Sequence, residues 1–191
     1  MAYEHVTGLD LSLAASAVVA VRHGPARPKV AMHLATSPPM ARGARPSLAE
    51  WVERQTIVAH DVLRHVEPGG LVVIEAPSHG SRFGNPHERA GLWWRVVQYL
   101  VRRGDAVATV APTTRAKYAS GSGRGDKKAV LAGIAEHYPY VTVRDHNLAD
   151  GLALAGMGWR ALARPIETAT ERYMTEAVAA VRWPNLTGDK P

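Results

Sequence analysis

The sequence predicts an α/β protein in which a mixed five-stranded sheet carries helices on both faces. Three short apolar stretches open the chain, at 6–9, 17–21 and 30–35, and turn residues separate them. This spacing predicts consecutive antiparallel hairpins. Helical and strand-like segments then alternate, which favours two further strands that are parallel and joined by helices. The apolar fraction of 46% in 191 residues is sufficient for one well-packed core.

Capping residues mark where the helices begin. Ser47 and Glu50 form a capping-box pattern, and Asn85 stands as a cap before a proline. We expect helices at about 46–66, 85–104, 126–137, 147–162 and 167–181, strands at 71–74 and 106–111, and between 112 and 126 a polar, glycine-rich loop that becomes ordered on binding. The chain would then form one domain over 1–183, followed by a flexible tail at 184–191.

Composition limits the classes of function. Lysine and arginine number 23, aspartate and glutamate 17, and the resulting net charge of +6 favours an anionic partner. The absence of cysteine excludes disulfides, thiolate zinc sites and cysteine nucleophiles. The nine histidines form no HExxH motif, so the sequence predicts no zinc site. Because no apolar run is long enough to span a bilayer and no signal peptide opens the chain, we expect a soluble cytoplasmic protein.

Three carboxylates occupy positions where burial favours apolar side chains. Asp10 and Glu75 each end an apolar strand, and Asp150 lies in the first turn of an apolar helix. If the strands of Asp10 and Glu75 are parallel neighbours, their carboxyl ends meet at the sheet edge where open α/β sheets bind ligands. Asp150 would then face both of them from its helix.

A cluster of carboxylates needs cations, because like charges a few ångströms apart repel one another. Mg²⁺ and Mn²⁺ prefer carboxylate oxygens and water as ligands. Two such ions about 4 Å apart activate water and stabilise the leaving oxygen of a phosphodiester. The pattern therefore favours a metal-dependent nuclease whose basic surface binds the polyanion.

Each carboxylate also has a purely structural interpretation. Asp10 suits a turn after a strand, Glu75 suits a salt bridge, and Asp150 suits a capping pair with Asn147. What favours the metal site is the joint occurrence of the three carboxylates, each after the appropriate secondary-structure element.

The segments around these carboxylates resemble one family. GLDLSL at 8–13, VVIEAP at 72–77 and DHNLADGLALAG at 145–156 are similar to the acidic motifs of RuvC-type crossover (Holliday) junction endodeoxyribonucleases, within the RNase H-like superfamily. KYASGSGRGDKKAV at 117–130 resembles the basic, glycine-rich segment that precedes a helix in RuvC-like proteins, especially phage-encoded ones. The motifs follow one another in family order and cover about residues 5–158.

The resemblance implies an RNase H-like fold, a homodimer, and paired nicking of branched DNA with two Mg²⁺ or Mn²⁺ ions in each active site. It also implies that the three carboxylates are catalytic metal ligands. The fourth ligand of the family, usually aspartate or histidine, falls on Asn147, which offers only a neutral carbonyl oxygen. Asp145 and His146 are therefore further candidates for that role.

Basic and aromatic side chains near the motifs are candidates for DNA contact. Glycines among the basic residues of 117–130 allow a close approach to phosphates, although a solvated loop would have the same composition. Phe83 follows the second acidic motif, and its ring would either stack on an unpaired base or anchor its loop in the core. The candidates are Lys117, Arg124, Lys127, Lys128, Arg82 and Phe83.

The sequence thus predicts a metal-dependent endonuclease that resolves four-way DNA junctions as a homodimer. Adjacent Trp93 and Trp94 cannot both face the core from one helix, so one of them is a candidate for the dimer interface. Two alternatives stay open: a nuclease with broader specificity for flaps, forks and replication intermediates, and a DNA-binding protein whose site has decayed through Asn147.

Overall fold

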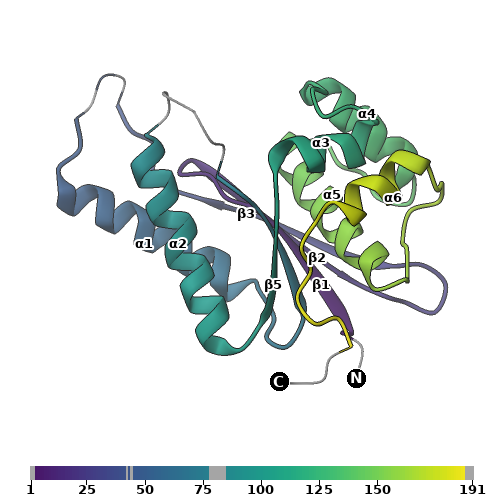
Figure 1. The fold of residues 1–191 in the computed structure, drawn as a ribbon. Helices are drawn as coiled ribbons and strands as arrows, with labels where there is room; N and C mark the ends of the chain where they lie inside the picture. The colour runs from purple at the N-terminus through teal and green to yellow at the C-terminus, as the bar shows by residue number, and fades with distance from the viewer. Residues whose placement is uncertain (1–2, 42, 44, 78–84, 188–191) are drawn as a thin grey trace.

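The computed structural model describes residues 3–41, 43, 45–77 and 85–187. Within them the chain forms a five-stranded sheet with the strand order β3-β2-β1-β4-β5 (Figure 1). The strands are β1 (His5–Asp10), β2 (Ala15–Arg22), β3 (Lys29–Thr36), β4 (Leu71–Glu75) and β5 (Ala106–Val110). β1, β2 and β3 pair antiparallel, whereas β1, β4 and β5 are parallel. The predicted fold class is therefore confirmed.

Helices cover both faces of the sheet. α1 (Leu48–Arg64) and α2 (Pro86–Arg103) lie on one face (Figure 1). The other face carries α3 (Pro112–Ser120), α4 (Lys127–His137), α5 (His146–Ala161) and α6 (Arg172–Ala179). In the described part of the chain, no helix is long and apolar enough to cross a membrane.

Alternation along the strands divides the core between the two faces, because successive side chains of a strand point in opposite directions. Leu9 packs beneath α1 and α2. Val6 and Val73 pack into the cluster that includes the buried residues of α5. Asp10 lies four residues after Val6 and Glu75 two after Val73, so both carboxylates face α5.

The predicted N-terminal cap is present in α1 but not in α2. The Ser47 hydroxyl accepts from the Glu50 backbone N–H, and the Glu50 carboxylate accepts from the Ser47 backbone N–H at 2.7 Å, which completes the predicted capping box of α1. Asn85 does precede α2, but within the described residues its side chain makes no capping hydrogen bond. Its backbone is left-handed, with φ of 56°, instead of the extended backbone from which a cap reaches the first amides.

The segment 112–126, predicted as a loop, begins instead with the helix α3. Its polar residues conceal a buried face that comprises Ala116, Tyr118 and Ala119. The Tyr118 hydroxyl lies in the core, where it donates to a Glu167 carboxylate oxygen at 3.0 Å. Burial of this face therefore outweighs the polar composition of the segment.

The C-terminal helix is shorter than the predicted 167–181 and covers only 172–179. Glu167 lies outside it, where its carboxylate forms a buried ion pair with Arg160 of α5 and the next backbone N–H, of Thr168, donates to the His137 carbonyl oxygen at 2.9 Å. Beyond the helix, Asn185 accepts a hydrogen bond from the Tyr3 hydroxyl at 3.1 Å, and Leu186 packs against the core. Residues 188–191 of the predicted tail lie outside the described residues.

Candidate active site

Asp10, Glu75 and Asp150 meet at the carboxyl ends of the parallel strands. β1 and β4 pair with Leu9 opposite Ile74, so the next residues along each strand, Asp10 and Glu75, are neighbours. Asp150 in α5 is close enough to interact electrostatically with both carboxylates. The structure thus brings the three predicted residues into one acidic cluster at this sheet edge.

A close approach of two backbones sets the position of Asp150. A Cβ atom on Gly8 of β1 would lie 2.0 Å from the Gly151 carbonyl oxygen, and a Cβ atom on Gly151 would lie 2.7 Å from the Val19 side chain. α5 therefore packs directly on β1 and β2, at a distance that only glycine allows. Since Asp150 precedes Gly151, this contact holds it at the end of β1.

Arg115 of α3 joins two of the carboxylates. Its Nε donates to Glu75 Oε2 at 2.7 Å, and its Nη1 lies 2.6 Å from Asp150 Oδ1. The three side chains are only 12–15% exposed. The salt bridge considered for Glu75 is therefore present, but it is part of the acidic cluster. No motif marks Arg115, since its position depends on the helix that the sequence did not predict.

Burial and repulsion make the acidic cluster hold protons. Burial, and then the charges of Glu75 and Asp150, raise the pKa of Asp10 from 3.8 to about 8. Burial also raises the pKa of Asp150 to about 6, while Arg115 opposes the rise. Although burial lowers the pKa of Arg115, its two carboxylate partners raise it above the ordinary value. One guanidinium thus does not balance the cluster, and the rest of the charge is met by a proton or by a further cation.

The candidates for a fourth ligand lie at the start of α5. Asp145 is the helix cap, because its Oδ1 accepts from the backbone N–H groups of Asn147 and Leu148 at 2.8 and 3.1 Å. The alternative in which Asn147 caps this helix is therefore wrong. His146 Nε2 lies 2.8 Å from Lys127 Nζ. All three candidates are partly exposed in or next to the first turn of α5, the turn that carries the third carboxylate.

Among the described residues predicted to contact DNA, Lys127 is the one that interacts electrostatically with the acidic cluster. Its charge opposes the rise in the pKa of both Asp10 and Asp150. Lys128 follows it in the first turn of α4, and Arg124 lies just before this helix; both side chains are exposed. The basic segment thus presents positive charge beside the acidic cluster.

The other predicted contacts are placed differently. Lys117 is in α3, where its Nζ lies 2.7 Å from a Glu176 carboxylate oxygen of α6. This pair makes Lys117 less available to a phosphate than Lys127. Arg82 and Phe83 lie outside the described residues.

A pocket of about 200 Å³ adjoins the acidic cluster and is lined by Asp10, Glu75 and Trp93, among others. The Trp93 indole N–H donates to the Glu75 backbone carbonyl at 2.8 Å, which helps to fix the end of β4. Trp94 packs edge-to-face on Trp93 but is 64% exposed. The prediction that only one of the two tryptophans faces the core is confirmed.

Comparison with known proteins shows the fold. Neither a protein-family model nor a curated protein matches this sequence. The structure of Thermus thermophilus RuvC is similar, with a TM-score of 0.59 and 15% identity over 85% of this chain and 99% of that chain. T. thermophilus RuvC in complex with a Holliday junction substrate gives a TM-score of 0.57 and 16% identity, over 86% and 99% of the two chains. The chain therefore has a RuvC-like, RNase H-like fold, as its motifs predicted.

Proposed function

We propose that this protein is a metal-dependent endonuclease that resolves four-way DNA junctions. The observation that supports this most is the acidic cluster of Asp10, Glu75 and Asp150, built at the sheet edge of a RuvC-like fold. The similar T. thermophilus protein was captured with a Holliday junction substrate. The basic residues beside the cluster suit the phosphates of such a substrate.

The donor set of the acidic cluster fits a hard divalent cation. Three carboxylates offer oxygen ligands, and burial, together with repulsion between the carboxylates, raises the pKa values of Asp10 and Asp150, an unfavourable state of the charged form that such a cation relieves. We propose that these residues, with Asn147 or Asp145 as a fourth ligand, hold two Mg²⁺ or Mn²⁺ ions. When bound, these ions supply Lewis-acid activation of water and stabilise the leaving oxygen.

The remaining residues of the site would bind and orient the DNA. Lys127, with Lys128 and Arg124, supplies cations for the phosphates that flank the scissile bond. Arg115 balances part of the charge of Glu75 and Asp150 while the metal is absent, and the raised pKa of Asp10 allows a proton to balance more of it. Metal binding then requires the guanidinium to share these carboxylates or to withdraw from them.

We further propose that the chain acts as a homodimer, because two symmetry-related sites would cut two strands of a junction symmetrically. Trp94 and Val101 lie seven residues apart on one face of α2 and are 64% and 58% exposed. Sedimentation should show a dimer that Trp94→Glu converts to a monomer. A wild-type monomer at micromolar concentration would contradict this proposal.

Cleavage of a panel of DNA structures tests the function. Four-way, three-way, flap and linear duplex DNA would be incubated with Mg²⁺ and with Mn²⁺ separately. We expect paired nicks in the four-way junction, lost in Asp10→Asn and retained in Glu53→Gln, which removes an exposed acid of α1.

The other outcomes identify the alternatives. Equal cleavage of flaps and forks would indicate the nuclease of broader specificity. Junction binding without cleavage in either metal would refute the nuclease and leave a DNA-binding protein.

A further inference from the structure

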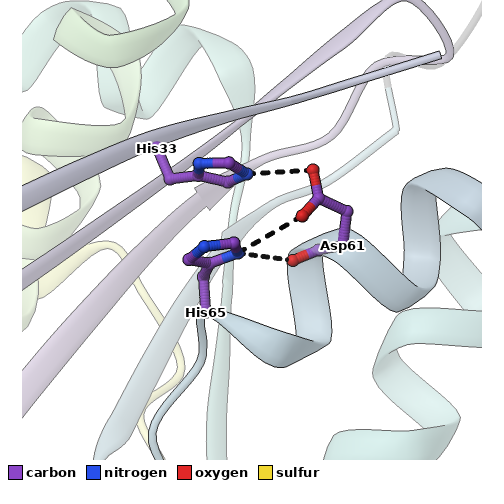
Figure 2. A group of neighbouring side chains, drawn as sticks. All are labelled: His33, Asp61 and His65. Carbon is purple, nitrogen blue, oxygen red and sulfur yellow. Dashed lines mark hydrogen bonds and ion pairs between the residues drawn. The ribbon is translucent and has the colours of Figure 1, made fainter.

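A second group of metal-ligating side chains lies on the other face of the sheet (Figure 2). His33 of β3 converges with Asp61 and His65 from the end of α1, and one possible ligand atom from each lies within 4.8 Å of the others. We refer to these three residues as the His–Asp–His cluster. Sequence motifs missed it, because one member comes from a strand and the local signal is only the spacing of Asp61 and His65, four residues apart.

The register of the sheet turns His33 toward α1. His33 pairs with Val18 of β2, and Val18 packs in the core beneath α1 and α2. Directly opposed residues on neighbouring strands point to the same face. Asp10 faces α5 instead, so the sheet separates the His–Asp–His cluster from the acidic cluster.

The contacts within the His–Asp–His cluster already resemble a set of ligands. His33 Nε2 lies 2.9 Å from Asp61 Oδ2, and His65 Nδ1 lies 3.5 Å from Asp61 Oδ1. The two imidazole rings stack, with centroids 3.6 Å apart and planes inclined by 18°, so both present a nitrogen to the same carboxylate (Figure 2). The three side chains are 23–34% exposed, which leaves the cluster open to an ion from solvent.

We propose that His33, Asp61 and His65 bind a divalent transition-metal ion, with Zn²⁺ as the preferred ion. Two imidazoles and one carboxylate match the ligands of zinc, whereas Mg²⁺ prefers oxygen alone. Tetrahedral zinc with bonds of about 2.0–2.1 Å needs donor atoms about 3.4 Å apart. Because the two rings are nearly parallel, binding would turn the imidazoles so that both nitrogen lone pairs point at one ion. Three protein ligands leave a fourth position for water. This proposal replaces the expectation that the chain has no zinc site.

Binding would exchange hydrogen bonds for metal ligation. His65 Nδ1 lies 2.8 Å from the Asp61 backbone carbonyl oxygen, so in the metal-free cluster it donates there, and His33 Nε2 donates to the carboxylate. The ion takes the place of these two protons, which move to the other ring nitrogen or to solvent. Arg64 Nη2 also contacts Asp61, at 3.1 Å, but its side chain is 65% exposed and free to turn outward. The bound ion would join the edge strand β3 to the end of α1.

Metal titration of the full-length, EDTA-treated protein tests the proposal. Zn²⁺ binding would be followed by calorimetry, and Co²⁺ by its visible absorption. With Mg²⁺ in excess to occupy the acidic cluster, we expect one Zn²⁺ site per chain, weakened at least tenfold by His33→Gln and by His65→Gln. His60→Gln is the matched control, because His60 is an exposed histidine of α1 outside the cluster. Asp10→Asn should leave this site intact, which separates it from the acidic cluster.

Thermal unfolding gives a second readout. With the same excess of Mg²⁺, added Zn²⁺ should raise the Tm of the wild type and of His60→Gln but not that of His33→Gln or His65→Gln, each shown to be folded by circular dichroism. Three results would overturn the proposal: no stoichiometric Zn²⁺ or Co²⁺ binding by the wild type, unchanged affinity in both cluster variants, or a site lost in Asp10→Asn and kept in His65→Gln.

Discussion

Asp10→Asn should make the metal-free protein more stable at neutral pH, although it removes a proposed metal ligand. The pKa of Asp10 in the folded protein is about 8, above its ordinary value of 3.8. The folded state therefore retains a proton that the unfolded chain releases between these two values. Stability contributed by this residue is present below pH 4 and falls as the pH rises toward 8. Asparagine stays neutral and avoids this loss.

The magnitude follows from the same two values. At pH 7 the unfolded carboxyl is about three pH units above its pKa of 3.8, and each unit corresponds to about 1.4 kcal/mol. The upper limit of the gain is thus about 4 kcal/mol, and relaxation around the ionised group reduces it. We expect a gain of about 2 kcal/mol, which for a domain of this size raises Tm by about 4–8 °C.

Urea and thermal unfolding in EDTA, at pH 4, 7 and 8, measure this effect. The free energy of unfolding of Asp10→Asn should exceed that of the wild type at pH 7 and 8 and equal it near pH 4. Mg²⁺ should stabilise only the wild type. A wild type that is at least as stable as Asp10→Asn at pH 8 would refute the electrostatic reasoning. So would a stability gap that stays constant down to pH 4. The variant should also bind junctions without cleaving them.

Three further substitutions test the site and its support. Arg115→Met leaves two buried carboxylates unpaired and should cost about 3 kcal/mol in EDTA by urea unfolding, partly restored by Mg²⁺; an unchanged midpoint would contradict the role given to the guanidinium. Gly8→Ala forces a Cβ atom against the Gly151 carbonyl oxygen and should lower stability by about 3 kcal/mol and abolish cleavage, whereas a fully active variant would show that α5 can shift without consequence. Lys127→Gln should weaken junction binding and reduce the slope of log K against log salt by about 1. Lys117→Gln should reduce this slope less. Equal slopes for the wild type and both variants would exclude both lysines from the interface.

The sheet and the acidic cluster were predictable because each depends on local patterns. Apolar runs located all five strands, and a carboxylate at the end of such a run is conspicuous by itself. The parallel pairing of β1 and β4 then places Asp10 beside Glu75 without further information. Asp150 was found through the resemblance and the apolar helix around it.

The parts that were missed depend on contacts between distant segments. α3 is polar in sequence, and the burial of Ala116, Tyr118 and Ala119, which favours the helix, depends on segments that are distant in the chain. Arg115 could not be assigned without that helix. His33 and Asp61 are 28 positions apart, and their contact follows from the register of β3 and its packing on α1. No short motif encodes such a pair.

The anchoring of α3 by Tyr118 has a consequence for the energetics of DNA recognition. Fixing the backbone of a flexible segment costs about 1–2 kcal/mol per residue in conformational entropy, and α3 has nine residues. A loop that became ordered only on the DNA would subtract this cost from its affinity. Because the helix is already folded in the free protein, the cost belongs to folding, and under the proposed function DNA would meet α3 as a preformed surface. Discrimination among branched substrates would then depend on how well each DNA fits that surface and on the free energy needed to bend the DNA onto it.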